Sequence, residues 1–389
     1  MWMYTLLNRG QTSNQKTIIK QYIMANISFF QIFKIKIKAL YELFVLWLIC
    51  KFFATMLILV SLKRYRMSHN NGIAGKGWLK IVDNADVPEH DFFEPGKIYP
   101  LTVRHASATF LDDAMKVIRS ISIKFSDHHF KSPFDMELNS GKFSVFWSVL
   151  SFIKFATSRK EKYGVDWVEY NKVYPDGSLG AAKSVRRHAT SFSNLHYHCK
   201  TPLLYIGKDG IKHYAKYRVI PYEDVPQSGT GEHDKNFDVS NQRVLSDENL
   251  GRNFLKDEYV ERVRKGPVSY KLQIQLRVAS DDEDKEVFNN MVIWNEKKYP
   301  WRELAYFEVT KTLDWAESTR TTFSINNMPK TLGILPAKSI YDYNSLNYLR
   351  AQTEIVKKVR LFSLKFFGMV PEIPDDDNRN IKVWSKKPL

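Results

Sequence analysis

The feature that most constrains the fold is a series of short segments in which apolar and polar residues alternate. The clearest is Ser269–Ser280 (SYKLQIQLRVAS), and similar alternation occurs in Lys97–Ser107, Arg119–Phe125 and Glu303–Thr312. Alternation with a period of two places every second side chain on the same face of a β-strand, so one face can be buried. Several such strands separated by turns predict an antiparallel barrel or sandwich.

A hairpin and three helices complete the predicted elements. Leu203–Ile206 and Ile211–Ile220 flank a Gly-Lys-Asp-Gly sequence, which is a typical hairpin turn. Helical spacing of apolar residues occurs in Asp112–Ile118, in Phe146–Thr157 and most clearly in Asn344–Phe367. The predicted fold class is therefore α+β, with an antiparallel β core, flanking helices and a C-terminal helix.

Composition excludes several classes of function. Two cysteines in 389 residues are too few for a disulfide framework or a cysteine-based zinc cluster. The net charge of +16 is unevenly distributed, because residues 1–66 contain ten Lys or Arg and one acidic residue. The remaining residues carry only +7 and contain no RNA-binding signature or helix-turn-helix pattern. We therefore expect no nucleic-acid partner.

The N-terminal segment 1–66 differs in composition from the rest of the chain. Residues 43–62 (LFVLWLICKFFATMLILVSL) are twenty predominantly apolar residues with one charge, Lys51, at the centre. This length is sufficient for a membrane anchor, which predicts a membrane-associated protein. A signal peptide is disfavoured by its distance from the N-terminus and the lack of a small-residue cleavage site. The third interpretation is an over-extended reading frame with translation starting at Met67, which predicts a cytoplasmic protein.

The remaining chain divides into one domain and a tail. Residues 67–370 contain all the predicted strands and helices and are expected to form a single domain. Within it, Gln227–Asp247 is rich in Gly, Ser, Asp and Asn and is predicted to be a surface loop. Residues 371–389 contain three prolines and a run of three Asp, and are predicted to be a tail.

A glycine-rich segment carries the first recognisable motif. It reads RMSHNNGIAGKGW from Arg66 to Trp78, with His69 in fourth place. Arg104 follows His69 by thirty-five residues, in a predicted strand. Asn139 lies in the sequence LNSG, just before the apolar stretch FSVFW. Small residues such as those after His69 allow the backbone to pass close to a flat ligand.

In order and spacing these segments resemble the heme catalases, especially the small catalase-related allene oxide synthases of corals and their relatives. The resemblance covers about residues 66–367 and implies a catalase-like antiparallel β-barrel that binds heme b. It implies that His69 and Asn139 are the distal residues that act on a peroxide, and that Arg66 and Arg104 pair with heme propionates. The implied activity is hydroperoxide dehydratase or peroxidase.

The same resemblance implies the partners of the protein. Its substrate would be a fatty-acid hydroperoxide, and hydrogen peroxide is the alternative substrate. A lipoxygenase would be the upstream enzyme that supplies the hydroperoxide.

The sequence departs from the family at the position of the axial ligand. The family has Arg-x-x-x-Tyr on its last helix, where the Tyr ligates iron and the Arg keeps it ionised. Here the sequence is Arg350-Ala-Gln-Thr-Glu354. Either Glu354 ligates ferric iron through an anionic oxygen, or it forms an ordinary helix pair with Arg350 worth about 0.2–0.5 kcal/mol. The second alternative predicts a catalase-like pseudoenzyme that binds a lipid or a weakly held heme.

Other histidines are candidates of lower rank. His196 and His198 share one face of a predicted strand, but no third metal ligand is evident nearby, so surface or barrel-lining roles are expected. His105 follows Arg104 on a strand and therefore points to the opposite face, where we expect it to be packed.

Overall fold

The computed structural model describes most of the domain and part of the N-terminal segment. Arg66 and the predicted tail 371–389 lie outside the described residues. The described residues are 29–61, 69, 71–108, 112–158, 166–230, 244–280 and 285–367.

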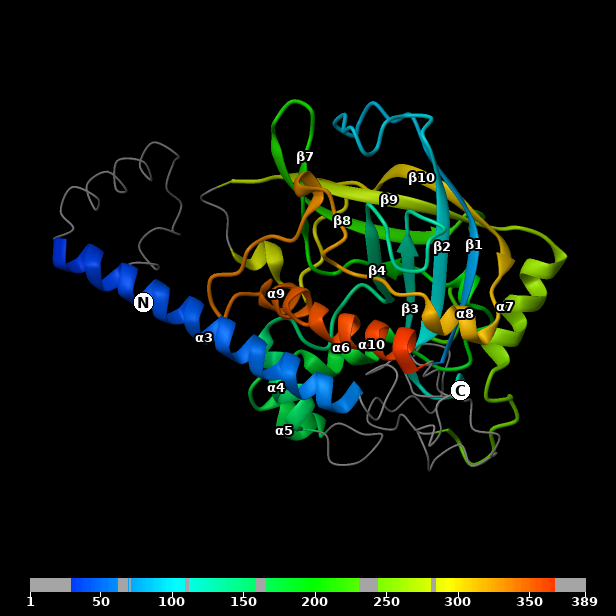
Figure 1. The fold of residues 1–389 in the computed structure, drawn as a ribbon, viewed down its shortest axis with the longest axis horizontal. Coiled ribbons are helices and arrows are strands. Elements are labelled where there is room, and N and C mark those ends of the chain that lie inside the picture. Colours follow the sequence, from blue (N-terminus) through cyan, green and yellow to red (C-terminus); the bar gives the residue numbers. More distant parts are fainter. Residues whose placement is uncertain are drawn as a thin grey trace.

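Eight antiparallel strands form a closed β-barrel (Figure 1). The sheet closes because β2 pairs with β3 as well as with β1. Two short strands extend it, since β5 (Val185–Arg186) pairs with β3 and β7 (Leu203–Ile206) pairs with β8. The predicted α+β class with a β-barrel core is confirmed. The barrel strands are β1 (Gly72–Ile81), β2 (Ile98–Ser107), β3 (Val117–Lys124), β4 (Asp135–Ser140), β6 (Tyr197–His198), β8 (Lys212–Pro221), β9 (Val268–Val278) and β10 (Arg302–Thr312).

The interior of the barrel is the main hydrophobic core, and alternation along each strand supplies its side chains. A histidine lies among them: His105 is fully buried, and its Nε2 and Nδ1 lie 2.9 Å and 3.3 Å from the hydroxyls of Tyr270 and Tyr197. Burial lowers the pKa of His105 to about 3, so the ring is neutral. His105 is packed, as the sequence predicted.

Helices cover the outside of the barrel, and α3, α4, α9 and α10 lie together along one side (Figure 1). Short 3₁₀ turns occur at η1 (Phe192–Asn194), η3 (Lys285–Phe288) and η4 (Lys330–Leu332). The helices are α3 (Phe29–Ser61), α4 (Val149–Thr157), α5 (Trp167–Asn171), α6 (Gly177–Ser184), α7 (Phe254–Lys265), α8 (Trp315–Arg320), α9 (Ser345–Gln352) and α10 (Glu354–Phe367).

The predicted helix Asp112–Ile118 is wrong, because these residues form a turn that leads into β3. Arg119 explains the difference, since its buried guanidinium donates to the backbone carbonyls of Asp113 and Met115. The carboxylate of Asp113 meanwhile accepts from Asn71 and Ser107. A buried cation at the start of β3 therefore uses carbonyls that a helix would need.

The two later helices are found, with changed limits. The first begins at Val149 rather than Phe146, because Ser148 and Ser151 form a capping box. The predicted helix Asn344–Phe367 is divided into α9 and α10 at Thr353.

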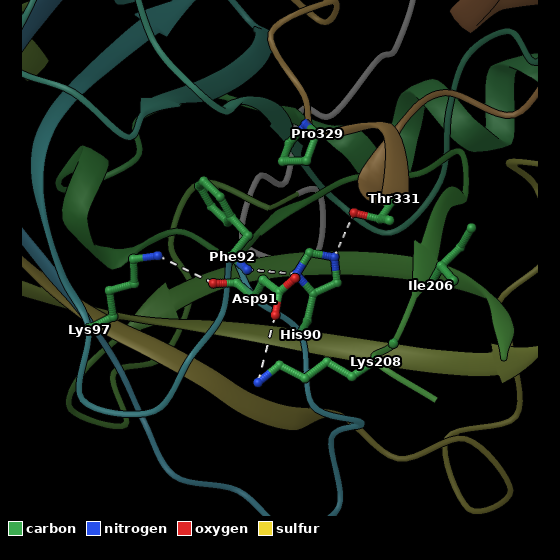
Figure 2. A pocket seen from close by; sticks show the side chains of 9 residues that line it. His90, Asp91, Phe92, Lys97, Ile206, Lys208, Pro329 and Thr331 are labelled. Atoms are coloured by element: carbon green, nitrogen blue, oxygen red, sulfur yellow. Dashed lines mark hydrogen bonds and ion pairs between the residues drawn. The ribbon is translucent and has the colours of Figure 1, made fainter. Parts of the chain in front are cut away.

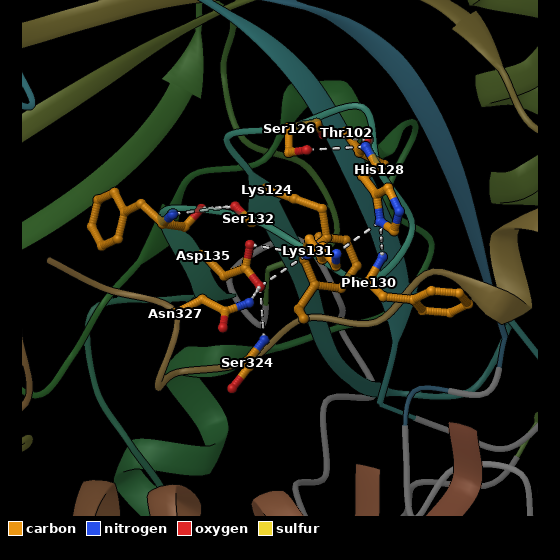
Figure 3. Close-up of polar contacts among 12 residues, drawn as sticks. Thr102, Lys124, Ser126, His128, Phe130, Lys131, Ser132, Asp135, Ser324 and Asn327 are labelled. Carbon is orange, nitrogen blue, oxygen red and sulfur yellow. Dashed lines mark hydrogen bonds and ion pairs between the residues drawn. The ribbon is translucent and has the colours of Figure 1, made fainter. Parts of the chain in front are cut away.

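A buried ion pair ties the segment after α8 to the barrel (Figure 3). Lys124 Nζ lies 3.1 Å from Asp135 Oδ2, and both side chains are fully buried. The same oxygen accepts from the backbone N–H of Ser324 and from the side-chain amide of Asn327, each at 2.9 Å. Burial raises the pKa of Asp135 and lowers that of Lys124, and each charge opposes the shift of the other. The carboxylate thus fixes residues 324–327 against β4.

Replacing Asp135 with Ala should lower the free energy of unfolding by about 3–5 kcal/mol, because it leaves the Lys124 charge buried without compensation. Urea unfolding measures this. The matched control is Glu261→Ala, which removes an exposed pair with Arg264 on α7 and should leave the free energy of unfolding nearly unchanged. A loss at Asp135 no larger than the control would contradict the structural role of the pair.

Candidate functional site

Of the predicted peroxide-side residues, Asn139 lies on the outer face of β4 and His69 lies just before β1. Neighbouring strands align Gly72 with Ala106, Ala106 with Ser120, and Ser120 with Asn139. His69 precedes Gly72 by three residues. Gly72 and Asn139, the two ends of this row, are therefore three inter-strand spacings apart, roughly 14 Å.

His69 and Arg104 are in direct contact. The Nη2 of Arg104 donates to the backbone carbonyl of His69 at 3.0 Å, and Arg104 is buried. The φ of His69 is +60°, a left-handed conformation that is uncommon outside glycine. The contact with Arg104 is one interaction that holds the chain in this turn before β1. Arg66, the other predicted propionate partner, lies outside the described residues.

Asn139 lies on β4 with its side chain directed out of the barrel. Its neighbour Leu138 belongs to the barrel core, and alternation places Glu137 and Asn139 on the opposite face. Across the ladder Asn139 is paired with His198 of β6. His198 is buried, and burial holds its pKa well below its usual value, so it is neutral. Among the described residues, no group of three or more His, Cys, Asp or Glu is arranged to hold a metal ion.

Glu137 connects β4 with both C-terminal helices. Its Oε2 accepts from Arg350 Nη2 on α9, and its Oε1 lies 3.3 Å from Lys357 Nζ on α10. Burial acts to raise the pKa of Glu137, but Lys357 and Arg350 outweigh it and lower the pKa to about 2. Lys357 also donates to the backbone carbonyl of Phe323. We call the contacts of Arg350 and Lys357 with Glu137 the charge bridge.

Glu354 and Arg350 bind to different parts of the molecule. Glu354 is the first residue of α10, and its Oε2 accepts from the hydroxyl of Ser324 at 2.6 Å. Arg350 donates to Asn347 and to Glu137 instead. The ordinary Glu–Arg helix pair, one of the two alternatives for this position, is therefore not what the structure shows.

Sequence reasoning missed Glu137 and Lys357. A signal for Glu137 was present, because Asp135, Glu137 and Asn139 alternate with the apolar Met136 and Leu138. This pattern places Glu137 on the outer face together with Asn139, although the same alternation is typical of a solvent-facing strand. Nothing in the local sequence identifies Lys357 as a partner, because it is 220 positions from Glu137.

Two cavities lie near the segment 325–336. One, of about 280 Å³, borders α9 at Tyr348 and Ala351 and is lined mainly by apolar residues that include Ile325, Met328 and Leu335. The other, of about 370 Å³, is shown in Figure 2 and contains none of the predicted site residues. Its polar groups are bonded to one another.

Side chains that line this second cavity contact one another (Figure 2). His90 Nε2 lies 2.8 Å from the hydroxyl of Thr331, and its Nδ1 accepts from the backbone N–H of Phe92. Lys208 Nζ lies 3.7 Å from a carboxylate oxygen of Asp91. The first cavity is therefore the better candidate for an apolar ligand group.

Comparison with known proteins agrees with this architecture. The chain is 32% identical over 309 residues to an allene oxide synthase-lipoxygenase protein of Plexaura homomalla, which covers 77% of this chain and 28% of that protein. A fungal catalase aligns with a TM-score of 0.55 at 16% identity, over 84% of this chain and 67% of the catalase. A bacterial catalase aligns with a TM-score of 0.56 at 14% identity, over 77% and 60%. The chain therefore has a catalase-like fold.

A second sequence relative is linolenate 9R-lipoxygenase of Nostoc sp., with 27% identity over 254 residues, 62% of this chain and 31% of that protein. The catalase-like chain thus spans less than a third of the length of these two curated relatives. No protein-family model matches it.

The residues of this catalase-like chain can be compared with the needs of a heme. Ferric iron requires an axial donor, and the propionates require cations. Glu354 offers a hard anionic oxygen at the predicted axial position, and its hydrogen bond from Ser324 is typical of ligating carboxylates. Arg104 offers a cation beside His69. In donor chemistry these residues fit a ferric heme, with carboxylate in place of phenolate.

The charge bridge predicts how stability depends on pH. Because the pKa of Glu137 in the folded protein is below its ordinary value of 4.5, its contribution is present above that value and is lost as the pH falls toward 2. We expect Glu137→Gln to melt at a lower temperature than the wild type at pH 7. The difference should shrink at pH 3.

Calorimetry at the two pH values measures this effect. The matched control is Glu303→Gln, which removes a pair with Lys271 between two barrel strands. A melting difference at Glu137 that is the same at both pH values would show that the charge is not its cause.

Proposed function

We propose that the chain is a catalase-related heme protein that acts on fatty-acid hydroperoxides, as a hydroperoxide dehydratase or peroxidase. The observation that carries the proposal is that Arg104, which contacts the backbone of His69, and Asn139 lie on one outer face of the barrel. This placement occurs in a chain similar, over 77% of its length, to a protein named for allene oxide synthase and lipoxygenase.

The substrate class is supported by both sequence relatives. Each is named as a lipoxygenase in whole or in part, and lipoxygenases form fatty-acid hydroperoxides. A lipoxygenase is therefore the proposed upstream enzyme. The apolar cavity of about 280 Å³ beside α9 is at the lower end of the range for ligand pockets and suits part of an acyl chain.

The proposed roles follow from the chemistry of each side chain. A bound heme would supply an iron able to cleave the O–O bond of the hydroperoxide. The imidazole of His69 would hydrogen-bond to the peroxide and move its proton. The amide of Asn139 would donate to the second oxygen. Arg104 would hold the backbone turn of His69 and contribute positive charge beside it.

A second candidate is favoured by the charge bridge. Glu137, Arg350 and Lys357 join the outer face of β4 directly to α9 and α10, and Glu354 is already bound to Ser324. A flat macrocycle could lie between these surfaces only if the bridge opened. This arrangement supports a catalase-like pseudoenzyme that binds a lipid without heme chemistry. Heme content of the purified protein separates the two candidates.

The first test replaces His69 with Asn, which tolerates the left-handed backbone at φ +60°. We expect one heme per chain to remain by its Soret absorption, because His69 acts on the peroxide. Conversion of a fatty-acid hydroperoxide should fall by about 10²–10⁴-fold.

The control for this test is His128→Asn, in the exposed turn between β3 and β4. It should leave conversion unchanged. Equal turnover in the two variants would remove His69 from the mechanism, and a wild-type protein that stays colourless after heme supplementation would reject the heme proposal.

The second test replaces Glu354 with Tyr and with Gln. Phenolate is a stronger donor to ferric iron than carboxylate, so Glu354→Tyr should raise heme occupancy in a titration. Glu354→Gln keeps the size of the side chain but removes its charge, and should lower the heme occupancy. The pseudoenzyme candidate predicts instead no heme binding by any form and a loss of about 1–3 kcal/mol from overpacking by the ring. No gain in occupancy with a lowered melting temperature would favour that candidate.

A further inference from the structure

Helix α3 is apolar on nearly all sides, although only one side touches the body of the protein. It extends over Phe29–Ser61, and its portion Phe30–Ile58 is long and apolar enough to cross a membrane. Only 17% of the tested window is buried. A helix that is hydrophobic all round requires a second apolar environment.

The inner stripe of α3 packs on the domain. Leu46, Cys50 and Ala54 are buried, and the first two share a cluster with Val149 of α4 and Leu349 of α9. Burial raises the pKa of the Cys50 thiol to about 11, which leaves it protonated. This stripe fixes the C-terminal half of α3 on the body.

The outer stripe is the opposite face of the same helix and is exposed to solvent. Its members recur at helical spacing and have exposed fractions between 49% at Ile37 and 73% at Phe30. Exposed apolar surface of this extent marks an interaction site. The outer stripe consists of Phe30, Ile37, Tyr41, Phe44, Leu48 and Phe52.

The packed inner stripe argues against the spanning anchor predicted at residues 43–62. A helix that crosses a bilayer needs about 20 residues surrounded by lipid. Leu46, Cys50 and Ala54 contact protein instead, and the part before them contains Lys34, Lys36 and Lys38. That part projects beyond the rest of the molecule (Figure 1).

We propose that α3 binds lengthwise to the surface of an anionic lipid bilayer. The outer stripe enters the boundary between headgroups and acyl chains, and the inner stripe stays on the domain. The three lysines, opposed by the single acid Glu42, supply the charge complementary to anionic headgroups. This inference does not depend on heme or on turnover.

Flotation of the full chain with vesicles tests the proposal. The vesicles contain phosphatidylcholine with phosphatidylserine, and the variant is Tyr41→Glu/Leu48→Glu on the outer stripe. The matched control is Ile98→Glu/Val168→Glu, which places the same charges at exposed apolar residues of the body. We expect binding to fall about tenfold or more in the variant and to be unchanged in the control. Carbonate washing should release the wild type.

Three results would overturn the proposal. Retention of the wild type in the membrane after carbonate would mean that α3 spans the bilayer. Equal flotation of variant and control, or no flotation of the wild type, would exclude this surface. A wild-type dimer in light scattering that the variant loses, without flotation of either, would assign the outer stripe to a second copy of the chain.

Discussion

The buried carboxylate of Asp135 is the point on which the arrangement of the candidate site depends. It neutralises Lys124 inside the structure and accepts from the loop that follows α8, so one oxygen joins two barrel strands and a segment almost 190 positions away. Ser324 and Phe323 of that segment in turn contact Glu354 and Lys357. The position of α10 relative to β4 therefore depends on the buried carboxylate of Asp135.

The charges of Arg350 and Glu354 already have partners within the protein, at the place where the family resemblance predicts an axial ligand. A Tyr at position 354 would place a phenol one turn from Arg350. Here the guanidinium has a carboxylate partner on the barrel, and the carboxylate at 354 has a hydroxyl partner on a loop. Each charge is satisfied without a cofactor, and each would also be available to one if the local contacts rearranged. An external ligand would thus compete with internal contacts for Arg350 and Glu354.

The strands were predictable from sequence because alternation is local: Ser269–Ser280 and Glu303–Thr312 became β9 and β10 nearly unchanged. The break at Thr353 was not, since it accompanies long-range bonds from Ser324 to Glu354 and from Asn326 to the carbonyl of Ala351. The lost helix at Asp112–Ile118 combines local bonds from Arg119 with a long-range bond from Asn71 to Asp113. Individual site residues came from a family resemblance, whereas their mutual contacts depend on pairs such as Arg350 and Glu137, which are 213 positions apart.

The cluster that α3 shares with α9 has a thermodynamic consequence. Leu46 and Cys50 lie against Leu346 and Leu349, one turn or less from Arg350. A bilayer bound to the outer stripe and a ligand that displaces α9 would be coupled only to the extent that both change this packed contact. By linkage, if bilayer binding changes the affinity for such a ligand by some factor, the ligand changes the affinity for the bilayer by the same factor. Under the proposed bilayer binding, lipid composition would thereby affect the ligand affinity of the candidate site, even for a ligand that does not touch a membrane.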